Sequence, residues 1–306
     1  MKTAQTKYAR HDPLHCLTPC LFKSLPTRQR EGIRLSARHS FGSVCVEFMG
    51  NQALGHSDLR LLQGLVALAG RDGKEICSQP ETHLGASLRN LLHLRDDAAD
   101  KTAIGMANLS YSGIIKEIGL KPNQRSVRII KDSLKRMSRV AIVLTHKELK
   151  TSESFRLLSY IDPAEGESLA IALNPTIARA MMGGRHVLID MNHVRELKRV
   201  PTILIHQRLC GFINPGRTKA VAMETLCNYA WPDPTGKAST LSMRRAAVNR
   251  ALEELRGIGW KVSEYRAERF QIGRPAMQSF AGAGEINDSG NHENSLKTHE
   301  NSLKIP

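Results

Sequence analysis

Residues 110–139 read SYSGIIKEIGLKPNQRSVRIIKDSLKRMSR, and this stretch indicates the fold more clearly than any other. Its first ten residues predict a short helix that ends at Gly119, and a Pro-Asn turn follows. The second part predicts a longer helix over 124–139, because apolar residues recur there at helical spacing on one face. The other face is basic, since residues 121–139 contain seven Lys or Arg and one acid, Asp132.

Two apolar stretches follow this basic helix, at 140–144 and 155–161, and a polar turn between them predicts a hairpin. Short helix, turn, basic helix and hairpin are the plan of a winged helix-turn-helix. The same order recurs later in the chain, with helices predicted over 223–229 and 242–258 and hairpin strands over 260–265 and 269–274. We therefore expect an α+β fold with two tandem winged helix-turn-helix domains.

The flanking sequence sets the expected domain boundaries. Residues 1–39 are basic, irregular and interrupted by prolines, which predicts an N-terminal arm. The two winged-helix domains then span 40–162 and 166–275. The low-complexity residues 276–306, which end in a repeated HENSLK segment, predict a disordered tail. Further elements are expected as strands at 44–48, 103–109, 169–173 and 186–191 and as helices from the N-cap Asp58 to Gly70, from Pro175 to Gly183 and over 201–213.

Composition narrows the class of partner. The 306 residues include 44 Lys or Arg and 29 Asp or Glu, for a formal net charge of +15. A positive charge of this size is typical of proteins that bind a polyanion, and nucleic acid is favoured over a membrane surface. The alternative is a basic protein without a nucleic-acid partner. No run of about 18 apolar residues is present, and the first residues do not resemble a secretory signal, so we expect a cytoplasmic protein without a membrane partner.

Motifs for metal binding and catalysis are missing from the sequence. The 6 cysteines form no CxxC pair, and the group around His11, His15 and Cys16 has irregular spacing, so we expect no metal. No Walker A motif, HExxH or GxSxG occurs, and no two histidines are spaced as the His-x-His pair of nicking enzymes. We therefore predict no cofactor, no catalytic residues and no enzyme activity.

The two basic helices supply the expected DNA contacts, because a helix fits the major groove and its exposed Arg and Asn side chains can bond base edges. Candidates for reading bases are Arg125, Arg128, Lys131, Arg244, Arg245 and Asn249. Candidates for contacting phosphates are Lys135, Arg136, Lys147, Lys150, Lys237, Arg250, Arg266, Arg269 and Arg274. The alternative for each residue is a solvated surface charge, so the clustering on common elements carries the prediction.

Six segments of the chain, in order, resemble the RepC replication initiators of IncQ-type plasmids. They are RHDPLHCL at 10–17, DLRLLQGLVA at 58–67, FRLLS at 155–159, ALNP at 172–175 with MGG at 182–184, HQRLCG at 206–211 and YAWP at 229–232. The resemblance implies an initiator that binds direct repeats (iterons) of double-stranded DNA at the vegetative origin. It also implies opening of an adjacent AT-rich region and the participation of the plasmid-encoded helicase and primase. A homodimer is possible for such initiators, although no interface is legible in the sequence.

Two alternative functions remain open at this point. A winged-helix transcriptional repressor would use the same DNA-binding modules but would not melt DNA. A nicking or priming enzyme is a candidate from another class, and the missing catalytic motifs argue against it.

Overall fold

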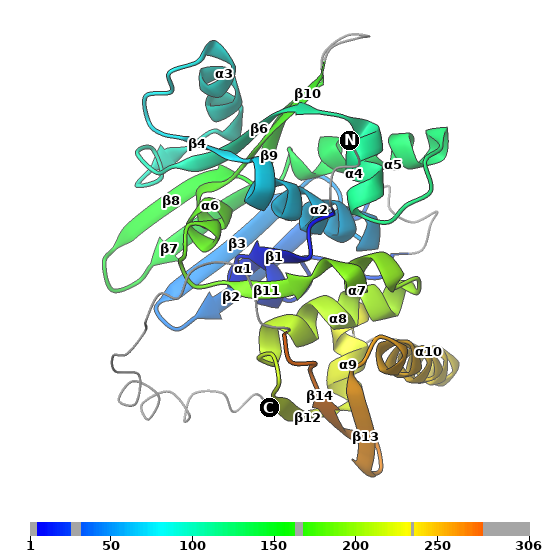
Figure 1. Cartoon of the computed structure of the whole chain (residues 1–306). Helices are drawn as coiled ribbons and strands as arrows, with labels where there is room; N and C mark the ends of the chain where they lie inside the picture. The colour runs from blue at the N-terminus through cyan, green and yellow to red at the C-terminus, as the bar shows by residue number, and fades with distance from the viewer. Residues whose placement is uncertain (1–4, 26–31, 163–167, 234–235, 278–306) are drawn as a thin grey trace, which may run out of the picture. The chain divides into compact units, whose positions relative to one another are not determined.

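The structure, a computed structural model, describes residues 5–25, 32–162, 168–233 and 236–277 and shows a mixed α/β fold (Figure 1). Its described strands form four sheets. The five-stranded sheet has the order β2 (Leu35–Phe41), β3 (Val44–Gly50), β7 (Ala141–His146), β8 (Thr151–Arg156) and β5 (Arg95–Asp96). The four-stranded sheet has the order β4 (Lys74–Ile76), β6 (Ala103–Leu109), β10 (Leu169–Leu173) and β9 (Leu158–Ile161). The smaller sheets are β12 (Thr218–Ala222), β14 (Arg269–Gly273) and β13 (Lys261–Arg266), and the pair of β1 (Tyr8–His11) and β11 (Val187–Asp190).

The helices mostly follow the predicted order. They are α1 (Pro13–Leu17), α2 (His56–Asp72), α3 (His83–Leu92), α4 (Tyr111–Glu117), α5 (Gln124–Met137), α6 (Pro175–Met181), α7 (Met191–Glu196), α8 (Val200–Phe212), α9 (Met223–Ala230) and α10 (Ala238–Gly257). The predicted basic helices are confirmed as α5 and α10, and α10 begins earlier than expected. The described helices are too short or too polar for any of them to cross a membrane.

Helix α2 lies at the centre of the main hydrophobic core. Its Leu59, Leu62 and Leu65 side chains are fully buried, and the helix contacts α4, α5, α7 and α8. The predicted N-cap at Asp58 is wrong by three positions. Gly55 is the N-cap, and the Asp58 carboxylate accepts a hydrogen bond from the Gly55 N–H at 2.8 Å. The helix also continues past Gly70, because its C-terminal cap falls at Gly73.

Regular elements occur within the predicted N-terminal arm. Residues 8–11 form β1, which pairs antiparallel with β11, and helix α1 follows directly. Pro13 does not break this segment because it occupies the first turn of α1, where a proline has no amide hydrogen bond to lose. Asp12 caps the helix by accepting a hydrogen bond from the Leu14 N–H at 2.7 Å. His15 and Cys16 are buried, so this part of the arm belongs to the core.

Strand pairing also crosses the expected boundary between the two winged-helix domains. Strand β9 ends at Ile161 and β10 begins at Leu169, and the two strands pair antiparallel in the four-stranded sheet. The chain through Ala276 forms one compact unit. The predicted domains therefore follow the order of elements along the chain and do not coincide with separate sheets. Most of the predicted tail, 278–306, lies outside the described residues.

Candidate nucleic-acid interface

Helix α5 presents a basic face above a buried apolar face. The Asn123 side chain caps the helix by accepting a hydrogen bond from the Ser126 N–H at 2.8 Å. Ile130, Leu134 and Met137 are fully buried beneath it, as the periodicity predicted. On the opposite face Arg125, Arg128 and Lys135 are exposed, and they form no ion pair with any residue that the structure describes. These three cations are available to an anionic ligand.

Lys131, on the same helix, already has partners. Its Nζ lies 3.4 Å from the Asp162 carboxylate and 5.0 Å from the centre of the Tyr111 ring. Half of the side chain is still exposed, at 52%. A nucleic acid can reach the exposed half of Lys131, where its phosphate would compete with the Asp162 carboxylate for the ammonium.

Arg136, a predicted phosphate contact, instead holds the fold together. Its guanidinium donates hydrogen bonds to the Asp58 carboxylate from Nε at 3.0 Å and from Nη2 at 2.8 Å. Asp58 is fully buried, and the Arg136 side chain is 14% exposed. The Ser133 hydroxyl accepts a further hydrogen bond at 2.9 Å. This guanidinium joins α5 to α2, so it is removed from the set of DNA contacts.

The hairpin that follows α5 differs from the predicted one. Strand β7 pairs with β8 from Ala141↔Arg156 to His146↔Thr151, whereas the predicted second strand had covered 155–161. Lys147 and Lys150, two predicted phosphate contacts, are exposed in the turn. Figure 1 shows the end of this hairpin at the far left and α5 at the right. The structure thus does not bring the hairpin turn beside the first turns of α5.

Helix α10 presents the second set of candidates. Val248, Ala251, Leu252 and Leu255 form its buried face, and Asn249 and Arg250 are exposed. Arg244 is held in place, because it donates a hydrogen bond to the Asp233 carbonyl at 2.7 Å and lies 5.9 Å from the centre of the Trp231 ring. Lys237 is exposed at the N-cap position of the helix.

The hairpin after α10 is joined to the helix. Arg266 and Arg269 are exposed and face each other as cross-strand partners at the turn between β13 and β14. In the same turn, Glu268 lies 3.3 Å from Arg245 of α10. The Glu268 carbonyl also accepts a hydrogen bond from the Met223 N–H, at the start of α9, at 2.9 Å. Figure 1 shows α9, α10 and this hairpin gathered in one region. The basic residues of the helix and of the hairpin therefore belong to one surface.

Arg274, also predicted to contact phosphates, is buried. Its Nη1 donates hydrogen bonds to the Cys210 carbonyl at 2.6 Å and to the Ile213 carbonyl at 3.0 Å, and its Nη2 donates to the Leu188 carbonyl. Only 8% of the residue is exposed. The side chain ties the end of β14 to α8 and β11, so its expected role is corrected from DNA contact to packing.

Glu268 is a residue of this interface that the sequence reasoning missed. The sequence contained a signal for this role, because Glu268 is an acid between Arg266 and Arg269 in an otherwise basic hairpin.

The described residues contain no candidate metal site. No group of three or more His, Cys, Asp or Glu side chains in the described ranges is arranged to hold a metal ion.

The fold and these surfaces define a mixed α/β protein with two basic helices, each followed by a hairpin. Residues 3–276 match the family model of Replication protein C (RepC). The chain therefore belongs to the RepC family of replication initiators. The search of curated proteins gave no match.

Matches among solved structures include two structures of RctB domains. A crystal structure of domains 2–3 of RctB (residues 155–483) has a TM-score of 0.52 at 12% identity and covers 86% of this chain and 97% of that chain. A structure of selenomethionine derivatives of domains 2 and 3 of RctB has a TM-score of 0.49 at 11% identity, covering 87% and 99%. At such identities the first likeness shows a common fold alone.

Proposed function

We propose that this chain initiates plasmid replication by binding direct repeats at the vegetative origin through two winged-helix modules. The first module consists of α4, α5 and the β7–β8 hairpin, and the second of α9, α10 and the sheet β12–β14–β13. The main support for this proposal is that the chain belongs to a replication initiator family and exposes basic side chains on both α5 and α10. A winged helix-turn-helix uses its second helix to enter the major groove.

The exposed side chains suit both parts of DNA recognition. Arginine can bond guanine twice and asparagine can bond adenine twice, so Arg128, Arg245 and Asn249 are suited to base reading. The full base-reading set is Arg125, Arg128, Lys131, Arg244, Arg245 and Asn249. We assign the phosphate contacts to Lys135, Lys147, Lys150, Lys237, Arg250, Arg266 and Arg269, after removal of Arg136 and Arg274, whose guanidinium groups are bound within the fold.

Origin opening would follow from binding along an array of repeats. Each neutralised phosphate releases counterions, and many such contacts can offset the cost of bending DNA and unstacking neighbouring base steps. The adjacent AT-rich region would open, and the plasmid-encoded helicase and primase would then load. The chain would not hydrolyse ATP in this process, because its sequence lacks the Walker A motif.

A gel-shift titration at physiological salt tests the DNA-binding step. It compares the plasmid's direct-repeat DNA with a scrambled duplex of equal length, without nucleotide. We expect the repeats to bind at least about a thousandfold more tightly, as specific DNA-binding proteins do. Equal affinity for both duplexes would contradict the proposal, because the net charge alone would then account for binding.

Permanganate footprinting on a supercoiled origin plasmid tests the opening step. We expect unpaired thymines in the AT-rich segment only when the protein is bound to the repeats. Tight, specific binding without thymine reactivity would instead support a transcriptional repressor that uses the same modules.

A further inference from the structure

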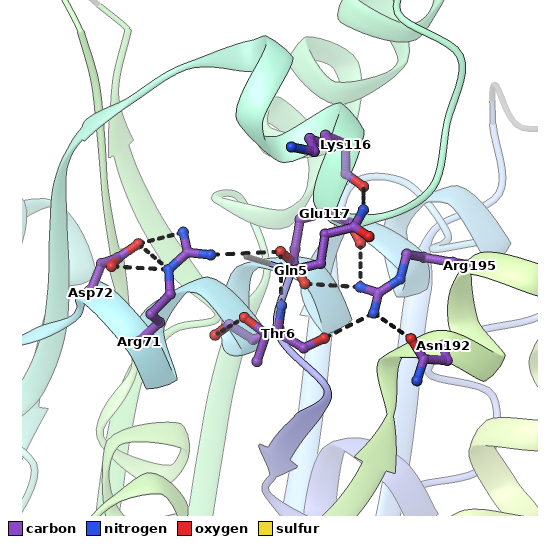
Figure 2. A network of polar contacts seen from close by, with 9 residues as sticks. Gln5, Thr6, Arg71, Asp72, Lys116, Glu117, Asn192 and Arg195 are labelled. Carbon is purple, nitrogen blue, oxygen red and sulfur yellow. Dashed lines mark hydrogen bonds and ion pairs between the residues drawn. The ribbon is translucent and has the colours of Figure 1, made fainter. Parts of the chain in front are cut away.

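Residues 191–199, which comprise α7 and the segment before α8, contact both proposed DNA-binding modules. On one side, Arg195 of α7 reaches Glu117 at the end of α4 (Figure 2). Its Nη1 lies 3.1 Å from the Glu117 carboxylate and donates a second hydrogen bond to the Glu117 carbonyl at 3.2 Å. Glu117 is 3% exposed and Arg195 is 12% exposed, so the pair is largely shielded from water.

Further contacts fix the orientation of Arg195. Its Nη2 donates hydrogen bonds to the Thr6 carbonyl and to the Asn192 side chain, both at 2.9 Å. The chain also approaches closely here, because a Cβ added to Gly119 would lie 2.9 Å from the Arg195 side chain. Gly119 has φ +69°, a conformation that glycine adopts without strain. The end of α4 and the turn before α5 are thus held against α7.

On the other side, the same segment is bound to α10. The carboxylate of Glu254 accepts hydrogen bonds from the Lys198 N–H at 2.6 Å and from the Thr202 hydroxyl at 2.7 Å. The Arg199 N–H also donates to it at 3.3 Å. Arg199 is the N-cap of α8 and has no side-chain capping bond of its own. Glu254 therefore supplies from α10 the acceptor that the N-terminus of α8 requires.

Helix α2 supports the middle of this connection. Arg60 of α2 donates hydrogen bonds to the Val194 carbonyl at 2.9 Å and to the Leu197 carbonyl. A continuous series of hydrogen-bonded contacts therefore runs from α4, through residues 191–199, to α10. Because hydrogen bonds to charged groups depend on direction and are stronger than neutral ones, this series restricts rotation of either module about residues 191–199.

We propose that Glu117 with Arg195, and Glu254, are positioning residues that set the DNA spacing at which α5 and α10 bind together. This inference rests on the proposed function, since it assumes that both helices bind one DNA repeat. One inserted base pair moves the second contact site by about 3.4 Å and rotates it by about 34° around the duplex. A rigid connection penalises that displacement, whereas a loosened connection tolerates it.

The test measures tolerance to inserted base pairs. Footprints of Arg128→Ala and Arg245→Ala first locate the base pairs that each helix protects. Duplexes with zero, one or two base pairs inserted between these positions are then titrated with the full chain. We expect the wild-type protein to lose at least about tenfold in affinity on the first insertion. For Glu117→Gln and Glu254→Gln we expect losses below about threefold, with affinity for the uninserted repeat close to that of wild type.

Glu47→Gln is the control for the loss of one negative charge. It removes the same charge from the pair of Glu47 with Arg38, in the five-stranded sheet, at 2.9 Å. This control should keep the wild-type insertion profile. If Glu117→Gln unfolds, as circular dichroism would reveal, Arg195→Lys serves in its place, since lysine keeps the charge but cannot satisfy all of these acceptors at once.

The outcomes separate the two proposals. The positioning roles would be overturned if the folded variants lost as much affinity as the wild type when base pairs are inserted. The variants concerned are Glu117→Gln or Arg195→Lys, together with Glu254→Gln. A wild-type protein that binds inserted and uninserted repeats equally would also overturn them. A wild-type protein with no preference for the repeats over scrambled DNA would instead refute the proposed function itself.

Discussion

The two basic helices differ in how their cations are held. On α5, Arg125 and Arg128 have no ion-pair partner among the described residues, and Arg136 is used internally to anchor the helix to α2. On α10, Arg244 is oriented by Trp231 and the Asp233 carbonyl, and Arg245 contacts Glu268. A free cation favours any nearby phosphate, whereas an oriented guanidinium favours one geometry. We therefore propose that α5 contributes more of the DNA affinity and that α10 contributes more of the sequence discrimination.

The hairpins that follow α5 and α10 also differ in where their turns lie relative to the helix. The β7–β8 hairpin belongs to the five-stranded sheet, and Figure 1 shows its turn away from α5. The β13–β14 hairpin belongs to the three-stranded sheet, and its turn contacts α10 through Arg245 and Glu268. We infer that α10 and its hairpin contact DNA as one surface, whereas α5 acts without its hairpin turn beside it.

The largest predicted effect separates the two neighbours Lys135 and Arg136. Arg136→Ala should lower the free energy of unfolding by about 3–5 kcal/mol, because it leaves the buried Asp58 carboxylate without its cation. Lys135→Ala should leave stability unchanged and weaken DNA binding. Urea unfolding and gel-shift titration of both variants check this. Equal stability of the two variants would show that Arg136 does not anchor α5.

The next effect concerns discrimination between sequences. Arg245→Ala and Asn249→Ala should each weaken binding to cognate repeats by about 1–3 kcal/mol and weaken binding to random DNA less. Lys135→Ala on α5, a proposed phosphate contact, should weaken both evenly and flatten the dependence of log affinity on log salt by about one. Competition titrations at several salt concentrations measure both quantities. A larger loss of specificity in Lys135→Ala than in Arg245→Ala would reverse the comparison.

His206 should make the side of α10 sensitive to acid. His206 of α8 lies with its ring 5.6 Å from that of Trp260, which directly precedes β13. Burial, with His193 and Arg274 nearby, lowers the pKa of His206 well below 6.5. The folded state therefore keeps the ring neutral, while the unfolded state takes up a proton below about pH 6.5. Stability is complete above that pH and falls below it by up to about 1.4 kcal/mol per pH unit for each such histidine.

Hydrogen exchange at pH 7 and pH 5.5 measures this effect. We expect protection of β13, β14 and α10 to fall more than protection of α5. His11 should add to the global loss, because burial lowers its pKa to about 3. His206→Gln should reduce the pH dependence of urea unfolding, and an unchanged slope would exclude His206 as its source.

Local sequence patterns were sufficient to predict α5 and α10. The roles of Arg136 and Arg274 and the presence of β1 depend on contacts between residues far apart in the sequence. The apolar periodicity of α5 and α10 was sufficient because each helix buries one face. Arg136 and Arg128 are alike in a local reading, and the partner that distinguishes Arg136 is Asp58, in a different helix. Arg274 is bound by carbonyls far away in the sequence, which carry no side-chain signal. Strand β1 escaped prediction because its partner β11 lies in the other half of the chain.

The smallest predicted effect tests whether Glu268 restrains the α10 surface. Glu268 places a negative charge between Arg266 and Arg269, at the turn proposed to face DNA, and holds Arg245 at 3.3 Å. Glu268→Gln should therefore tighten DNA binding, by up to about fivefold, because exposed ion pairs contribute about 0.2–1 kcal/mol. The affinity for random DNA should rise more than the affinity for cognate DNA, because Arg245 would no longer be oriented. The specificity should therefore fall. Titrations of cognate and random duplexes, with Glu47→Gln as the charge-matched control, measure both. An equal gain in the control would mean that net charge alone causes the change, and a loss of affinity would mean that Glu268 orients Arg245 more than it repels DNA.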